Sequence, residues 1–140
     1  MHKSILIIDD DDYLSNLLME FLQLKGFIVY REPDGPSGAA KAREILPDLI
    51  TLDFNMPGVT GVETYKELRQ YPATAVIPIL FFSSTLLGLI KRLLTDNDRV
   101  RFLKKGCQTT ELERCVNEML ALPKLTPPPH PFHNRRRHPR

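Results

Sequence analysis

Short apolar runs alternate along the chain with segments in which apolar residues recur every three or four positions. The runs predict five strands, at residues 5–8, 27–30, 48–53, 76–84 and 101–105. The first, third and fourth runs are almost continuously aliphatic, which is typical of central strands that are buried on both faces. The second and fifth runs are less purely apolar, so we expect these two strands at the edges of the sheet.

The segments between the strands have helical periodicity. Leu14, Leu17, Leu18 and Phe21 follow the i, i+3, i+4, i+7 spacing of one helix face, and Gly26 is a natural stop for that helix. Four more helices are predicted, in residues 32–46, through 62–68, over 86–94 and through 112–119. Five strands that alternate with five helices indicate an α/β fold with a doubly wound parallel sheet and helices on both faces.

The segment over residues 86–94 is unusually rich in leucine. Its six apolar side chains would spread over about 160° of a helix, which is wider than the roughly 100° stripe that a surface helix buries. Two interpretations are open for it. The helix is seated deeply in the fold, or it exposes an apolar ridge for dimerisation or for a partner.

The chain changes character at Pro123. Residues 123–140 include six of the 12 prolines, five of the 19 basic side chains and none of the 17 acidic ones. They carry a charge of +5, while residues 1–122 carry −3. We therefore expect one domain at 1–122 and a disordered basic tail at 123–140. Such a tail would bind nucleic acid only weakly and in a salt-sensitive manner.

The sequence predicts no membrane segment. No apolar run approaches the roughly 20 residues that span a bilayer. The first residues lead directly into a strand and lack the pattern of a signal peptide. A cytoplasmic location is the expectation.

Polar side chains follow the strands in places where they should meet. Asp9 and Asp10 follow the first strand, Asp53 the third, Ser83 lies at the end of the fourth, and Lys105 ends the fifth. The carboxyl ends of parallel strands share one edge of a sheet, and ligands bind there. Clustered carboxylates attract a hard divalent cation, and an aspartate beside a cation, a lysine and a hydroxyl can act as a nucleophile toward a phosphoryl group.

Two further acidic residues, Asp11 and Asp12, begin the helix that follows the first strand. Acidic side chains at a helix start accept hydrogen bonds from free backbone N–H groups and oppose the helix dipole. The sequence does not decide which of the two is the cap. The acidic run is therefore expected to serve the site with its first half and the helix with its second.

Four motifs, in order, resemble the receiver domain of two-component response regulators. They are "IIDDD", "LITLDFNMPGVTG", "IPILFFSS" and "FLKKGCQTTEL", and 43 residues separate Asp10 from Asp53. The resemblance runs from about residue 4 to residue 122. It implies a flavodoxin-like strand order 2-1-3-4-5 and a domain similar to the single-domain chemotaxis regulators.

The resemblance also implies a phosphorylation site and its cofactor. Asp53 would be the phosphorylated nucleophile. Mg²⁺ or Mn²⁺ would be bound by Asp10, Asp53 and the backbone carbonyl of Asn55, with Asp9 acting mainly through a water molecule. Asn55 and Thr85 would tune the rate of dephosphorylation.

The same resemblance assigns the residues that would respond to the phosphoryl group. Ser83 and Lys105 would contact its oxygens, and Phe102 occupies the position of the switch aromatic residue. Lys104 competes for the lysine role, but the seven-residue spacing to Leu112 favours Lys105. Where the family usually has proline after this lysine, often with a cis bond, this chain has Gly106.

The predicted function is that of a stand-alone receiver, a phosphoacceptor and not an enzyme with turnover. Its donor would be a histidine kinase or a phosphotransfer protein. Its output surface would comprise the helix over 86–94, the fifth strand and the last helix, with a homodimer left open. Two alternatives are an adaptor that acts through the basic tail on an acidic partner or nucleic acid, and an aspartyl-nucleophile phosphatase.

Overall fold

The computed structural model describes residues 2–84 and 99–127, and in them five parallel strands form one sheet in the order β2-β1-β3-β4-β5. The strands are β1 (Ser4–Ile8), β2 (Ile28–Glu32), β3 (Leu49–Leu52), β4 (Ile79–Ser83) and β5 (Val100–Lys104). The predicted fold class and strand order are confirmed. The two less apolar strands, β2 and β5, lie at the edges as expected.

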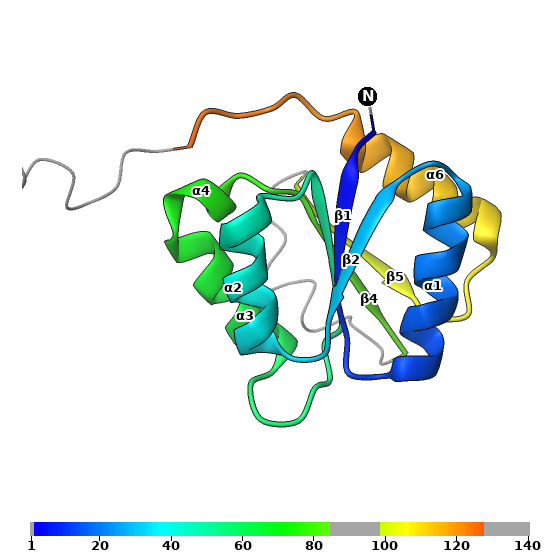
Figure 1. Cartoon of the computed structure of the whole chain (residues 1–140), viewed down its shortest axis with the longest axis horizontal. Helices are drawn as coiled ribbons and strands as arrows, with labels where there is room; N and C mark the ends of the chain where they lie inside the picture. The colour runs from blue at the N-terminus through cyan, green and yellow to red at the C-terminus, as the bar shows by residue number, and fades with distance from the viewer. Residues whose placement is uncertain (1, 85–98, 128–140) are drawn as a thin grey trace, which may run out of the picture.

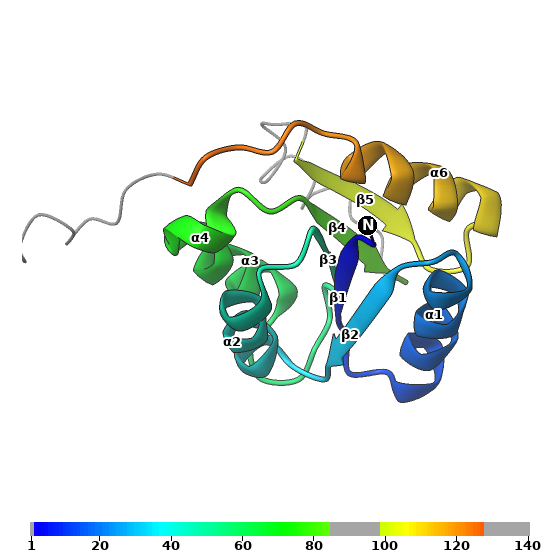
Figure 2. The same cartoon turned by 45° about the horizontal axis from the view of Figure 1, so that its top comes forward.

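Helices cover both faces of the sheet (Figures 1 and 2). The described helices are α1 (Asp12–Leu24), α2 (Gly35–Ile45), α3 (Gly61–Gln70), α4 (Pro72–Ala75) and α6 (Thr109–Leu120). α1 and α6 lie on one face, and α2, α3 and α4 lie on the other. Among the described residues, no helix is long and apolar enough to cross a membrane.

Each face of the sheet has its own buried cluster, because alternate side chains of a strand point to opposite faces. Ile5 and Ile7 of β1 pack with α1 and α6 residues such as Leu22. Leu6 and Ile8 pack on the other face with residues such as Ala42 of α2. β1 and β3 are buried along almost their whole length, so the loops that follow them are held firmly in place.

The buried face of α1 differs from the predicted stripe. Leu18 is buried, but Leu14 and Leu17 are exposed, and Ser15 and Leu22 complete the buried side. The i, i+3, i+4 pattern was therefore a wrong guide to burial here. The predicted stripe combines Leu18, which faces the sheet, with Leu14 and Leu17, which face solvent.

One short helix was not predicted. α4 occupies residues that the sequence pattern left as a connection, and Val76 is its C-cap, so β4 begins later than expected. The predicted leucine-rich helix over 86–94 and the tail beyond residue 127 lie outside the described residues.

Candidate functional site

Three aspartates meet at the carboxyl edge of the sheet. Asp9 follows β1 and Asp53 follows β3, and these neighbouring strands pair Ile8 with Leu52 just before the two acids. Asp9 and Asp53 are only 5% and 7% exposed, whereas Asp10 is exposed. One carboxylate oxygen from each of the three lies within 4.8 Å of the others.

Lys105 lies over two of these acids. Its Nζ is 2.7 Å from Oδ2 of Asp9 and 3.7 Å from Oδ2 of Asp53, and its side chain is 10% exposed. Burial alone would lower the pKa of Lys105, but the hydrogen bond and the charge of Asp9 outweigh it and raise the pKa above its usual value. Lys104, the other candidate from the sequence, is exposed.

Asp53 is buried next to a second carboxylate, and both conditions disfavour its charged form. Burial and the neighbouring charge of Asp9 raise the pKa of Asp53. Lys105, the hydroxyl of Ser83 and the backbone of Asn55 oppose that rise without cancelling it. Any additional positive charge near Asp53 would stabilise its ionised form and lower its pKa.

The loop after β3 is held close to Asp53 by the start of α3. The N–H of Gly61 donates to the carbonyl of Phe54 at 2.9 Å, and Thr60 caps α3 in a reciprocal pair with Glu63. A Cβ atom on Gly61 would lie 2.3 Å from the backbone oxygen of Asp53, so only glycine fits there without displacing the chain. Asn55, in the middle of this loop, is exposed.

Ser83 and Phe102 lie on neighbouring strands beside the acids. Ser83 ends β4, is fully buried, and hydrogen-bonds to the side chain of Asp53. Phe102 in β5 is half-buried and stacks on Phe81, with ring centroids 5.2 Å apart and the planes 9° from parallel. Thr85, the remaining predicted site residue, lies outside the described residues.

The loop after Lys105 has a trans peptide bond at Gly106, since the described chain contains no cis bond. Gly106 has a φ of +93°, a conformation that residues with a side chain rarely adopt. The backbone N–H of Lys105 donates to the carbonyl of Ser83 at 2.8 Å. This arrangement places the lysine without the proline that is usual in the resembled family.

The acidic run divides at the start of α1. Asp11 is the N-cap, and its Oδ1 accepts from the N–H of Leu14 at 3.1 Å. Asp12 instead pairs with Arg31 of β2 at 2.7 Å. Arg31 was not predicted as part of the site, because its closeness to the acids follows only from the pairing of β1 with β2, which places it opposite Ile7.

The donor set fits a hard divalent ion. Carboxylate oxygens are the ligands that Mg²⁺ prefers, and it is usually bound by one or two carboxylates together with water and phosphate oxygens. Asp10, the most exposed of the three acids, and Asp53 could supply those carboxylates, while Asp9 is already engaged by Lys105. The repulsion that raises the pKa of Asp53 would be offset by such an ion.

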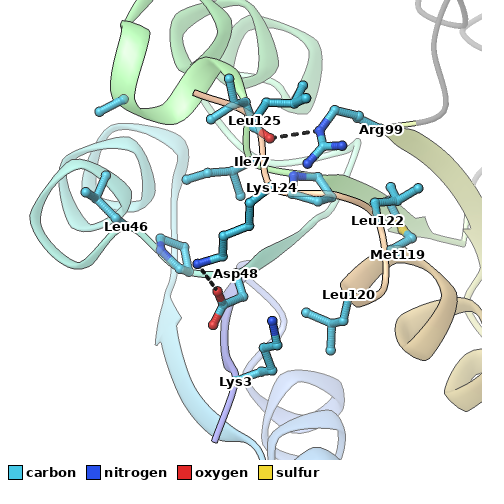
Figure 3. Close-up of a pocket in the computed structure, with 14 residues that line it drawn as sticks. Lys3, Leu46, Asp48, Ile77, Arg99, Met119, Leu120, Leu122, Lys124 and Leu125 are labelled. Carbon is cyan, nitrogen blue, oxygen red and sulfur yellow. Dashed lines mark hydrogen bonds and ion pairs between the residues drawn. The ribbon is translucent and has the colours of Figure 1, made fainter. Parts of the chain in front are cut away.

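A separate pocket of about 170 Å³ lies at the amino edge of the sheet, and Figure 3 shows its lining. Asp48 and Lys124 form an ion pair of 3.3 Å across it, and Arg99 donates to the carbonyl of Pro123 at 2.9 Å. The first tail residues thus contact the domain. None of the predicted site residues that the structure describes lines this pocket.

Comparison with known proteins identifies the class. Residues 5–117 match the family described as the response regulator receiver domain, and the chain belongs to this family. The predicted family is confirmed.

Two curated relatives illustrate the match. The phosphate regulon transcriptional regulatory protein PhoB of Rhizobium meliloti is 37% identical over 128 residues, which is 86% of this chain and 53% of the relative. The DNA-binding dual master transcriptional regulator RpaA of Synechocystis is 42% identical over 118 residues, 83% of this chain and 48% of the relative. The chain spans about half the length of these proteins.

Solved structures have the same fold. The chemotaxis protein CheY4 of Vibrio cholerae has a TM-score of 0.79 at 25% identity and covers 85% of this chain, and 99% of its own chain is matched. The receiver domain of the sensor histidine kinase PA1611 of Pseudomonas aeruginosa has a TM-score of 0.77 at 20% identity, with 87% of this chain and 100% of its own chain covered. That structure is described with a magnesium ion coordinated in its active-site cleft.

Proposed function

We propose that this chain is a phosphoacceptor switch that takes a phosphoryl group on Asp53 from a phosphohistidine of a histidine kinase or phosphotransfer protein. The observation that carries the proposal is the cluster of Asp9, Asp10 and Asp53, two of which, Asp9 and Asp53, lie within ion-pair distance of Lys105. The neighbouring acids can bind a divalent cation, and the cation and the Lys105 ammonium would together stabilise the negative charge of a phosphoryl group transferred to Asp53.

The reaction balances as a transfer between two groups. An oxygen of the Asp53 carboxylate attacks the phosphorus, the bond from phosphorus to the histidine nitrogen breaks, and the nitrogen keeps the electron pair. The product is an acyl phosphate on Asp53, which water later hydrolyses to the carboxylate and free phosphate. This self-catalysed transfer and loss is the only chemistry that we assign to the chain.

The residues around Asp53 have distinct parts in this proposal. Asp10, Asp53 and the carbonyl of Asn55 would bind Mg²⁺ or Mn²⁺, with Asp9 acting through a water molecule, and the ion would neutralise charge on the phosphoryl oxygens. Lys105 would pair with a second oxygen and Ser83 would donate a hydrogen bond to a third. Asn55 and Thr85, each two residues past a site residue, would tune the lifetime of the acyl phosphate.

The readout would pass through the β4–β5 side of the sheet. Ser83 moving toward the phosphoryl group would open space near Phe102, whose stacking on Phe81 connects it to the core. The predicted output surface comprises the helix over 86–94, β5 and α6, where a downstream protein or a second copy of the chain would bind.

The exposed Leu14 and Leu17 of α1 follow the acidic run closely in the sequence and offer an apolar surface to the phosphodonor protein. We place this protein in the cytoplasm, where such donors present their phosphohistidine.

Incubation with Mg²⁺ and phosphoramidate, followed by intact mass measurement, tests the proposal. We expect the mass of one phosphoryl group to be added to the wild type and to Asp48→Ala, but not to Asp53→Ala. Asp48 is a matched control because it flanks the other end of the same strand. Failure of the wild type to gain phosphate, or gain of phosphate by Asp53→Ala, would refute it. Steady release of phosphate from phosphomonoesters would favour a phosphatase.

A further inference from the structure

Arg31 connects edge strand β2 to the acidic loop after β1. Its Nη2 donates both to the backbone carbonyl of Asp9 at 3.0 Å and to Oδ1 of Asp12 at 2.7 Å. The Arg31 side chain is only 17% exposed, and its Nε is buried without a hydrogen-bond partner. The two hydrogen bonds of Nη2 are charge-assisted on the donor side and therefore strong, so they hold the guanidinium in place although its buried Nε is unsatisfied.

The carbonyl that Arg31 binds belongs to the peptide unit that leads into Asp10. Because the peptide is planar, fixing the Asp9 carbonyl also fixes the direction of the Asp10 N–H and Cα. Two other bonds hold the same turn: Asp9 N–H donates to the carbonyl of Glu32 at 3.1 Å, and Asp11 N–H donates to Oδ1 of Asp9 at 2.9 Å. Asp10, the exposed acid of the cluster, is thus oriented by the backbone that Arg31 holds.

Arg31 also separates the acids by task. Its contact with Asp12 directs that carboxylate toward β2 and away from the cluster of Asp9, Asp10 and Asp53. Four adjacent acids could otherwise compete for one cation in several arrangements. With Asp11 at the helix cap and Asp12 on Arg31, the cluster of Asp9, Asp10 and Asp53 is left to face the cation.

We propose that Arg31 is a positioning residue that presets Asp10 for the divalent cation. The proposal rests on the proposed function, since it assumes that the acidic cluster binds Mg²⁺. It also makes a prediction with a definite sign. The positive charge of Arg31 by itself repels a cation, so removing it would strengthen Mg²⁺ binding if charge were its only influence. If Arg31 acts by positioning, removing it weakens binding.

Calorimetric titration with Mg²⁺ at pH 7 and fixed ionic strength distinguishes the two. We expect Arg31→Met to weaken Mg²⁺ binding about tenfold, at the lower end of the effect of groups that orient metal ligands. Arg31→Lys keeps the charge but replaces the planar fork with a single ammonium, and we expect it to weaken binding about threefold. Arg43→Met is the matched control, because it breaks an arginine–carboxylate pair of 3.2 Å with Glu67 between α2 and α3.

The outcomes separate the inference from the function beneath it. Equal or tighter Mg²⁺ binding by Arg31→Met, with binding by the wild type intact, overturns the positioning role. The positioning role is also overturned if Arg43→Met weakens binding as much as Arg31→Met does. Absence of Mg²⁺ binding by the wild type refutes the proposed function instead. Thermal unfolding without metal shows whether Arg31→Met is folded, and if it is not, Arg31→Lys decides alone, because its charge is unchanged.

Discussion

Asp48 and Asp53 flank the same four-residue strand, yet their surroundings shift their pKa values in opposite directions. Asp48 comes before β3 at the amino edge, and Asp53 follows it at the carboxyl edge. Burial works to raise the pKa of Asp48, but the backbone N–H of Ser4, at 2.8 Å, and Lys124 outweigh it, so the pKa is lowered. The pKa of Asp53 is raised by burial and by Asp9.

The two acids differ in how far the surrounding residues compensate their charge. Asp48 has partners that satisfy its charge in the resting state. Asp53 is next to a second acid and shares its lysine with that acid, so its charge is only partly compensated. A carboxylate whose charge the surrounding residues do not neutralise is stabilised most by a bound cation, and perturbed groups of this kind are typical of functional sites.

The largest expected effect is on stabilisation by metal. At a Mg²⁺ concentration 100 times the Kd, binding to the native state alone adds about 2.7 kcal/mol to the free energy of unfolding. Asp53→Asn should lose most of this gain because it removes a ligand, whereas Asp48→Asn should keep it. Urea unfolding with and without Mg²⁺ measures both. An equal loss in the two variants would show that the ion does not bind at the carboxyl edge.

The next effect concerns the backbone behind Asp53. Gly61→Ala places a Cβ against the main chain of Asp53 and Phe54, and overpacking of this kind costs about 1–3 kcal/mol. We expect it to lower both the unfolding midpoint and the rate of phosphorylation by phosphoramidate. Gly58→Ala is the control, because its Cβ would have open space and only its φ of +80° is unfavourable. A variant Gly61→Ala that matches wild type in both measurements would contradict the close approach.

The pH dependence of stability without metal should differ in sign between the two acids. A raised native pKa means that Asp53 costs stability once the pH rises above the unfolded value of about 3.9, so Asp53→Asn should be more stable than wild type at pH 7 but equal to it at pH 3. A lowered native pKa means that Asp48 contributes stability above about pH 3.9, which is lost as the pH falls through the native value.

Asp48→Asn should therefore be less stable than wild type at pH 7, by about 1 kcal/mol, and the deficit should disappear at low pH. Urea unfolding of both variants from pH 3 to pH 7 provides the measurement. If both substitutions shift stability in the same direction at pH 7, the contrast between the two ends of β3 is wrong.

The smallest expected effect is at the tail. Lys124→Ala removes an exposed partner of Asp48, and exposed ion pairs contribute about 0.2–1 kcal/mol. Salt screens such pairs, so the loss should shrink at 1 M salt. Unfolding at low and high salt tests this, with Lys66→Ala on the exposed side of α3 as the control. A salt-independent loss would assign the role of Lys124 to packing.

Local patterns in the sequence predicted the strands, the edge positions of β2 and β5, and the identity of the acidic cluster, whereas the strand order 2-1-3-4-5 was implied by the resemblance to the receiver family. Continuous aliphatic runs located β1, β3 and β4, and acids directly after them had to meet at one edge. Lys105 was selected over Lys104 by spacing, and the structure places it between Asp9 and Asp53.

Features that depend on contacts between distant segments could not be predicted. The apolar spacing in α1 did not reveal that Leu14 and Leu17 face solvent, because periodicity gives a helix face but not its neighbours. α4 is a single turn and too short for periodicity to reveal. Arg31 acts across two strands, so its partners become visible only once β1 and β2 are paired.

The two ends of the described chain bear on how the protein can be labelled. Residue 2 and residues 123–127 lie at the amino edge of the sheet, where the ring of His2 donates a hydrogen bond to the carbonyl of Gly26 and Lys124 meets Asp48. A strand of four or five residues, roughly 15 Å, separates that edge from Asp53. A surface tether or a fluorophore attached at either end would therefore leave the acidic edge accessible, and energy transfer from such a fluorophore to a dye on the phosphodonor protein would report on donor binding.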